Sequence, residues 1–271
     1  MVDAKDAGPR FEFDRDTWVE PDAEGGFRAE VSPGWNIGSN PNGGYLASIA
    51  LAALARSVPH HDPLAVTAHY ASRVSPGPVG VVVDVLRTGR GLSTVVARLV
   101  QEGDVRVQVT AAFGDLSARE GPTVVTAERP SFPPPEACVP VDPSIPGVPE
   151  IMRRLDMRLT PESAGFAIGR RSGVAAMEGW VRFADGREPD TRTLVVAADA
   201  FPPTVLNLME TPWVPTIELT VHVRARPAPG WLQCAFRTRY LIDGDLEEDG
   251  ELWDSSGRLV ALSRQLARVR G

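Results

Sequence analysis

Three polar residues in the second half of the chain stand where the first half carries apolar residues. Sliding the sequence along itself by about 150 residues pairs Asp199 with Leu51, Thr216 with Ala65, and Gln265 with Ala111. A buried carboxylate is costly unless it is hydrogen-bonded, charge-paired or raised in pKa, and a hydroxyl and an amide can supply such hydrogen bonds. The three residues are therefore candidates for one reactive site in the second half.

The same offset aligns other features of the two halves. The offset pairs one set of turn residues, Arg73, Pro76 and Pro78, with another, Arg224, Pro227 and Pro229. It also pairs residues 91–103 with residues 245–257. A duplicated scaffold needs the same packing twice but its chemistry only once. Positions that are apolar in one copy and polar in the other are therefore the ones to examine.

Asp199 admits two interpretations at this level. Val195 lies four residues earlier, so on a helix the carboxylate projects from the same face as an apolar residue that should meet the sheet. Alternatively, Asp199 caps the turn that begins Phe201-Pro202-Pro203, a common role for aspartate near proline. The spacing alone leaves both interpretations open.

Gln265 lies in an alternating ladder near the C-terminus. The ladder Leu259, Ala261, Ser263, Gln265, Ala267 matches the set Val105, Val107, Val109, Ala111, Phe113 that the first half should point inward. An inward glutamine must have its amide hydrogen-bonded. A slip of one residue would instead turn Gln265 to solvent, although Arg264 on the opposite face argues against it. Thr216 alone is uninformative, because threonine is a common strand residue.

The pair Gly43-Gly44 opens the most apolar segment of the chain. Glycines at a helix start let a ligand approach backbone N–H groups at the positive end of the helix dipole, as a thioester oxyanion or a phosphate would require. The competing explanation is that Gly44 only permits close packing. Gly43 and Gly44 are therefore candidate substrate-binding residues.

These residues must be positioned by two similar sets of elements. The sequence predicts a strand, a helix and four strands in each half, with antiparallel neighbours because turn signals separate the strands. For the first half the predicted ranges are strand 27–31, helix 43–58, and strands 64–74, 79–88, 93–101 and 105–113. For the second half they are strand 173–183, a helix from Thr191 to about Ala200 with Asp190 as its N-cap, and strands 216–224, 231–241, 246–253 and 258–269.

The organisation along the chain follows from this repeat. We expect an N-terminal module over residues 1–115, a proline-rich linker laid over the surface at 116–150, and a C-terminal module over 151–271 that carries the reactive groups. In each module, one long helix should be wrapped by one curved antiparallel sheet, giving an α+β fold.

Composition excludes several classes of function. The net charge of -7 argues against a nucleic-acid partner, which would need a concentrated basic face. The two cysteines, Cys138 and Cys234, form neither a metal pattern nor a disulfide framework, so a reducing cytoplasm is expected. No apolar run is long enough for a membrane span, and residues 1–10 lack the apolar core of a secretory signal. The four histidines are not spaced as a metal site, and no nucleotide-binding motif is present.

Several segments together resemble the type II acyl-CoA thioesterase family, whose fold is a double hot-dog. The resemblance rests on Trp180-Val181-Arg182, Asp185-Gly186, Pro189-Asp190, Ala197-Ala198-Asp199, Thr216-Ile217-Glu218, the run 257–265, and Asn42-Gly43-Gly44-Tyr45-Leu46. It covers almost the whole chain except the linker. The chain departs from the family after Asp199, where Ala200-Phe201-Pro202-Pro203 replaces a more usual polar-aromatic sequence.

The resemblance implies hydrolysis of an acyl-CoA to a carboxylic acid and CoA, without metal or cofactor. The family's catalytic aspartate, threonine and glutamine fall on Asp199, Thr216 and Gln265, which would together bind and polarise the attacking water. A non-catalytic acyl-CoA-binding protein remains an alternative, because a fold does not fix an activity. A hydratase of this fold is disfavoured, since Phe201 and Thr204 replace the asparagine and histidine that it would carry after the aspartate. A homo-oligomer is possible.

Overall fold

A computed structural model describes residues 9–23, 25–210 and 213–270 of the chain. The expectation for residues 1–10 falls almost entirely outside this range. Within it, no helix combines the length and the apolar character that a bilayer span requires. The cysteines Cys138 and Cys234 are buried and free.

The first half contains the predicted strand, helix and four strands. After the short helix α1 (Glu12–Asp16) and strand β1 (Glu20–Pro21), the elements are β2 (Phe27–Val31), η1 (Pro33–Trp35), β3 (Asn36–Ile37), β4 (Asn40–Pro41), α2 (Gly43–Ser57), β5 (Asp62–Tyr70), β6 (Gly77–Thr88), β7 (Ser93–Gln101) and β8 (Asp104–Gly114). The boundaries of β2 are those expected, and α2 ends one residue earlier than expected.

The second half repeats this order after an insertion that the periodicity did not predict. The intervening elements are η2 (Leu116–Ala118), η3 (Pro135–Ala137), β9 (Val139–Pro140), η4 (Glu150–Arg153), β10 (Leu155–Leu159), α3 (Pro161–Ala164) and η5 (Gly165–Ile168). The repeated elements are β11 (Ala176–Phe183), α4 (Thr193–Ala197), β12 (Thr216–Val223), β13 (Leu232–Ile242), β14 (Asp245–Trp253) and β15 (Leu259–Arg268), with η6 (Thr204–Asn207) between α4 and β12.

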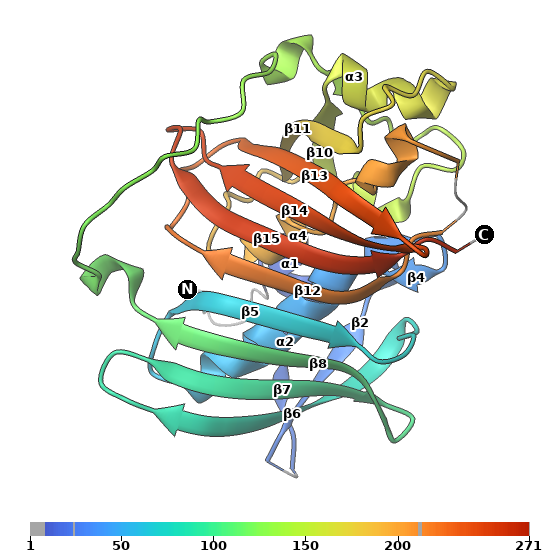
Figure 1. Ribbon diagram of the computed structural model, residues 1–271. Helices are drawn as coiled ribbons and strands as arrows, with labels where there is room; N and C mark the ends of the chain where they lie inside the picture. Colours follow the sequence, from blue (N-terminus) through green and yellow to red (C-terminus); the bar gives the residue numbers. More distant parts are fainter. Residues whose placement is uncertain (1–8, 24, 211–212, 271) are drawn as a thin grey trace, which may run out of the picture.

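A single antiparallel sheet of 13 strands runs through both halves in the order β1-β2-β6-β7-β8-β5-β12-β15-β14-β13-β11-β10-β9. The first half contributes the order β2-β6-β7-β8-β5, and the second half contributes the corresponding strands in the reverse order, β12-β15-β14-β13-β11. This is the arrangement of two copies of one unit that join edge to edge through corresponding strands. The junction is the pair β5–β12, where Val66 faces Val221 and the hydroxyls of Thr67 and Thr220 are 2.8 Å apart. The two halves therefore share one continuous sheet (Figure 1).

Helix α2 lies against the concave side of this sheet (Figure 1). Every residue from Gly44 to Leu54 is buried, as its apolar character on all sides predicted. Asn42 begins the helix by accepting a hydrogen bond from the Tyr45 backbone N–H at 2.9 Å. The Tyr45 ring stacks on Trp35 at 5.1 Å between centroids, which ties the helix start to the preceding loop.

The helix of the second half is much shorter than expected. We predicted a long helix in each module, from Thr191 to about Ala200 in the second, but α4 spans only Thr193–Ala197. The N-cap of α4 is Arg192, so the prediction of Asp190 as the N-cap was wrong. Asp190 instead closes the turn before the helix, where its Oδ1 accepts the N–H groups of Arg192 and Thr193 at 2.9 and 3.0 Å. At its end, Pro202 and Pro203 cannot continue a helix.

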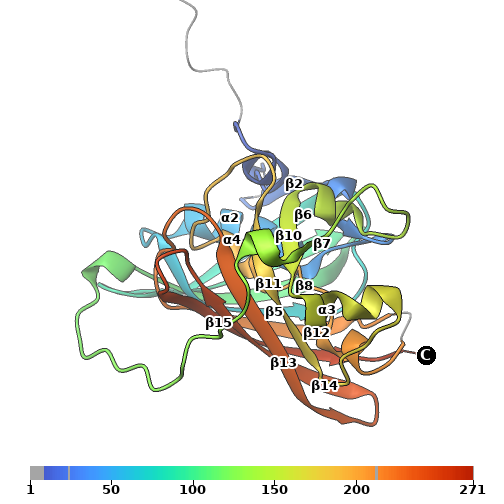
Figure 2. The ribbon, with the colours of Figure 1, turned by 90° about the horizontal axis from the view of Figure 1, so that it is seen from above.

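The proline-rich linker does more than cover the surface. Its first part runs along the outside of the molecule (Figures 1 and 2), but its second part adds β9 to the edge of the sheet beside β10. Val141 and Val148, farther along the linker, line a cavity between this segment and the second half. The linker is thus part of the wall of an interior space.

Helices α2 and α4 cross at Gly44. A Cβ at this position would lie 2.6 Å from the Val195 carbonyl oxygen and 3.0 Å from the Asp199 Cβ. No other residue has room there, because the nearest obstacle is backbone rather than a flexible side chain. The close-packing explanation for Gly44 is therefore correct.

We predict that Gly44→Ala destabilises the protein by about 1–3 kcal/mol, because the added methyl group forces the two helices apart. The measurement is the free energy of unfolding in urea. Gly91→Ala is the matched control, since a Cβ at Gly91 meets no atom within 4 Å and the change should be nearly neutral. Equal stability of both variants would contradict the tight crossing.

Candidate active site

The Asp199 carboxylate is held by the N-terminus of α2, in the other half of the molecule. Its Oδ2 accepts hydrogen bonds from the Gly44 backbone N–H and from Asn42 Nδ2, both at 2.8 Å. Asn42 Nδ2 also donates to the Asp199 carbonyl oxygen at 2.9 Å. These hydrogen bonds tie Asp199 to α2 and not to the turn at Phe201-Pro202-Pro203, which was the alternative interpretation.

Burial raises the pKa of Asp199 to about 6. The hydrogen bonds from Gly44, Asn42 and Gly43 work in the opposite direction, because they stabilise the charged form. Desolvation is the larger effect. The result is a carboxylate that is ionised at neutral pH yet basic enough to accept a proton.

Thr216 and Gln265 form a second hydrogen-bonded unit. Gln265 Nε2 donates to Thr216 Oγ1 at 2.8 Å. Gln265 shares the inward face of β15 with Ala261 and Ala267, which are fully buried, whereas Leu262 and Leu266 are more than one-third exposed. The burial therefore agrees with the predicted inward ladder from Ala261 to Ala267 but not at its start, where Val260 is fully buried and Leu259 only partly.

A bulge in β12 turns Thr216 toward Gln265. Leu219 and Val221 are inward on β12, so simple alternation would place Ile217 inward and Thr216 outward. The register with β15 shifts between Thr216 and Glu218, and Ile217 is 41% exposed. Bulges often re-aim a side chain beside an active site, and this one has that effect.

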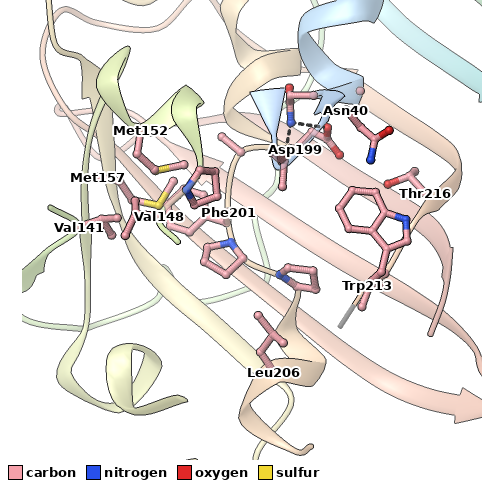
Figure 3. A pocket seen from close by; sticks show the side chains of 18 of the residues that line it. Asn40, Val141, Val148, Met152, Met157, Asp199, Phe201, Leu206, Trp213 and Thr216 are labelled. Atoms are coloured by element: carbon pink, nitrogen blue, oxygen red, sulfur yellow. Dashed lines mark hydrogen bonds between the residues drawn. The ribbon is translucent and has the colours of Figure 1, made fainter. Parts of the chain in front are cut away.

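One cavity of about 1510 Å³ brings these groups together. Asp199, Thr216, Gln265 and Gly43 all line it. In the view of Figure 3, Asp199 and Thr216 lie toward one side with Asn40 and Trp213, and the sulfur-containing side chains of Met152 and Met157 lie toward the other. The three predicted catalytic residues line the same cavity but are not all hydrogen-bonded to one another. Thr216 and Gln265 bond to each other, whereas the Asp199 carboxylate bonds to the start of α2.

Both glycines of the pair lie against other groups of the protein. The Gly44 N–H, which the sequence suggested for a substrate oxyanion, donates to Asp199 instead. Gly43 lies at the cavity wall, and a Cβ there would be 2.8 Å from the hydroxyl oxygen of Tyr70. Gly44 therefore permits the close approach of α4, and Gly43 permits the close approach of the Tyr70 ring.

The sequence did not reveal three further polar residues of the site, namely Asn42, Tyr70 and Glu248. For Asn42 a signal existed, because asparagine before a glycine pair is a good N-cap and its side chain could be expected at the helix start. Tyr70 and Glu248 occupy strand positions where nothing in the local pattern marks them. Only the packing of β5 and β14 around the cavity shows that they belong to it.

Glu248 is a second buried carboxyl group in the cavity wall, 7% exposed. It pairs across the strands with Gln265, and its Oε2 accepts the Thr204 backbone N–H at 2.8 Å. Burial raises the pKa of Glu248 to about 7, and the nearby charge of Asp199 raises it further in the same direction. Glu248 thus holds the loop that follows Asp199.

The rest of the cavity wall is largely apolar. It includes Val141 and Val148 from the linker, Met157 from β10, and Phe201 and Leu206 from the segment after α4. Phe201 packs on Phe236 with 5.1 Å between ring centroids. The departure after Asp199 therefore supplies apolar wall to the cavity. Across the described ranges, no group of three or more His, Cys, Asp or Glu side chains is arranged to hold a metal ion.

Two family models match the chain. The acyl-CoA thioesterase N-terminal domain matches residues 31–114, and the acyl-CoA thioesterase C-terminal domain matches residues 135–269. The chain belongs to the acyl-CoA thioesterase family. The first matched segment of this thioesterase-family chain runs from the end of β2 to β8, and the second runs from η3 through β15 and so includes the inserted elements. Residues 115–134 lie between the two segments.

Solved structures similar to this thioesterase-family chain have the same architecture. A protein from Thermobifida fusca described as a candidate thioesterase II is 35% identical, with a TM-score of 0.89 over 97% of this chain and 99% of that one. A hot-dog protein of unknown function from Alicyclobacillus acidocaldarius is 26% identical, with a TM-score of 0.85 over 96% and 98%. Acyl-CoA thioesterase II TesB2 from Mycobacterium marinum is 17% identical, with a TM-score of 0.71 over 95% and 98%, a likeness of fold alone. The fold is of the hot-dog type.

We predict that Glu248→Gln stabilises the protein at pH 8 by roughly 1–3 kcal/mol, at about 1.4 kcal/mol per unit of pKa shift. A carboxyl whose pKa is raised on folding contributes stability below its unfolded pKa and loses it as pH rises through about 7, so the wild type bears the cost of the buried charge at pH 8. The amide oxygen can still accept the Thr204 N–H. Urea unfolding at pH 8 and at pH 5 measures the difference.

At pH 5 the advantage of Glu248→Gln should largely disappear, because the wild-type carboxyl is then mostly protonated. Glu247→Gln, at the neighbouring position of β14 on the opposite face of the sheet, is the matched control for loss of a carboxylate outside the cavity. A constant stability difference at both pH values would mean that Glu248 does not titrate as described.

Proposed function

We propose that the protein hydrolyses acyl-CoA thioesters to the free carboxylic acid and CoA, using a water held by Asp199, Thr216 and Gln265. The observation that carries the proposal is one cavity lined by a carboxylate with a pKa of about 6 and by a Thr216–Gln265 pair. Membership of the acyl-CoA thioesterase family supports the same reaction. The two modules, one with a long helix and one with a short helix, would act as a double hot-dog with one active site.

The proposed reaction has two steps. The oxygen of the water forms a bond to the thioester carbonyl carbon while Asp199 takes one of its protons, and the carbonyl electron pair moves onto the carbonyl oxygen. When this oxyanion collapses, the C–S bond breaks, and the thiolate receives the proton from Asp199 to leave as the thiol. The products are a carboxylic acid and CoA, and Asp199 is ionised again.

Thr216 and Gln265 would fix the position of the water. Gln265 uses one amide hydrogen on Thr216 Oγ1, which orients that hydroxyl within the cavity. Hydrogen bonding between the two side chains restricts their rotamers before the substrate arrives, so less entropy is lost on binding the water. Gly44 and Asn42 would hold the carboxylate in place instead of contacting the substrate.

We predict that Asp199→Asn lowers kcat for thiol release from acyl-CoA by about 10²–10⁴-fold, the usual contribution of a general base. The amide oxygen of asparagine can still accept the Gly44 and Asn42 hydrogen bonds, so the melting temperature should not fall. A thiol-release assay with a panel of acyl chain lengths gives the rates. Asp84→Asn is the control and should leave the rate unchanged, because Asp84 on β6 forms an exposed ion pair with Arg98 on β7.

The rate of the wild type should also rise with pH through about 6 and level off above it, because only the ionised Asp199 can accept the proton. This rise should be absent in the residual activity of Asp199→Asn. Unchanged turnover in that variant would remove Asp199 from the reaction. Tight binding of acyl-CoA by the wild type without any thiol release would instead select the non-catalytic binding protein.

The apolar wall is the natural site for the acyl chain. Val148 comes from the linker, is partly buried and lines the cavity near Met152 and Met157 (Figure 3). A cavity of about 1510 Å³ exceeds the roughly 300–1,000 Å³ of common small-molecule sites, so it offers room for a long acyl group. The linker would then help to determine which acyl chains are accepted.

We predict that Val148→Trp lowers kcat/KM for long-chain acyl-CoA about 10-fold or more and leaves short-chain acyl-CoA within about 3-fold, because the indole fills space that only a long chain needs. Val124→Trp is the control, since Val124 lies in the same linker but is 81% exposed. Rates across a series of acyl chain lengths check this, and an equal loss for all lengths would place the acyl chain elsewhere.

A further inference from the structure

The proposed hydrolysis needs a hydrogen-bond donor for the oxyanion, and the start of α2 is already occupied. The Gly44 N–H donates to Asp199 Oδ2, and the Gly43 N–H also stabilises that carboxylate. A donor bonded to a permanent carboxylate gains nothing from the charge that develops on the substrate. Another donor must therefore face the carbonyl oxygen.

Tyr70 is the last residue of β5 and lines the same cavity as Asp199. Its hydroxyl oxygen is buried and, within the described part of the chain, has no hydrogen-bond partner. Leaving a buried hydroxyl unsatisfied destabilises the folded state, and such groups in folded proteins call for an explanation. A substrate group that binds in the cavity would provide one.

The position of the hydroxyl fits a contact with the reacting group. It lies where a Cβ of Gly43 would be only 2.8 Å away, which places it against the start of α2. Burial raises the pKa of Tyr70 well above its usual value, and the nearby charges of Asp199 and Glu218 act in the same direction. The phenol is therefore neutral at any working pH and keeps its proton to donate.

Gly43 supports this geometry from the other side. Any larger residue there would collide with the ring of Tyr70, whose Cζ is also 2.8 Å from the Cβ position. The absent side chain lets the phenol reach the wall next to the carboxylate. The first glycine of the pair would thus serve the substrate indirectly, by making room for the donor.

We propose that the Tyr70 hydroxyl donates a hydrogen bond to the thioester carbonyl oxygen and stabilises the oxyanion formed when water attacks. This rests on the proposed thioester hydrolysis and adds to it a group from the first module. The carboxylate and the Thr216–Gln265 pair come from the second module, so each half of the chain would contribute to one reaction centre.

The test is Tyr70→Phe, which removes one oxygen atom that bonds to no described protein group. We expect kcat to fall on the order of 10²–10³-fold with little change in KM, as for loss of an oxyanion donor. The melting temperature and the pH midpoint of the rate should stay as in the wild type. Tyr240→Phe, at a tyrosine on β13 that is 59% exposed, is the matched control.

A second measurement does not depend on turnover. An acyl-CoA analogue with methylene in place of sulfur and ¹³C at the ketone carbon cannot be hydrolysed, and a hydrogen bond to its carbonyl lowers the infrared stretching frequency. Tyr70→Phe should raise this frequency relative to the wild type, and Tyr240→Phe should not. Unchanged kcat, or an unchanged frequency with the analogue bound, would overturn the role of Tyr70. A wild type that releases no thiol would overturn the proposed function, and the frequency shift would still decide the contact.

Discussion

The Asp199 carboxylate of the second half is hydrogen-bonded to the first half of the molecule, and the candidate site depends on this interaction. It leaves the short helix of the second half and is bound by Asn42 and Gly44 at the start of the long helix of the first. The two groups satisfy each other, because a buried carboxylate needs donors and the buried N–H groups at a helix start need acceptors. These hydrogen bonds therefore have two effects. They join the two modules, and they lower the pKa of Asp199 against the larger effect of burial.

The duplicated fold explains why such a contact is available. The sheet continues from β5 into β12, so the helices on its concave side are brought face to face at Gly44. The first half has a long helix that is buried from Gly44 to Leu54, and the second half has only the short helix Thr193–Ala197 before its chain turns away. The shortening opens space beside the long helix, and the cavity with its apolar wall occupies that space.

Much of this fold could be predicted from the alternation of apolar residues. Strand β2 and helix α2 lie where the pattern placed them, and Gln265 is inward because its strand keeps a simple period of two. The prediction failed where local rules compete with tertiary contacts. The second helix is short because two prolines and an irregular turn at Asp190 limit it. Strand β10 forms because it pairs with the free edge of β11, and β9 of the linker then pairs with β10. A sequence pattern does not encode the availability of that edge.

The residue types were set by the sequence itself: a carboxylate, a hydroxyl and an amide at positions that the sister module fills with apolar side chains, and a glycine pair before a helix that must be buried. Their mutual arrangement was decided only in three dimensions. A bulge after Thr216 reverses the direction of its side chain, the Gly44 N–H serves Asp199 and not a ligand, and Tyr70 and Glu248 reach the cavity from strands in different halves. Periodicity fixes which face of an element a residue occupies, but only packing of distant elements fixes which faces confront each other.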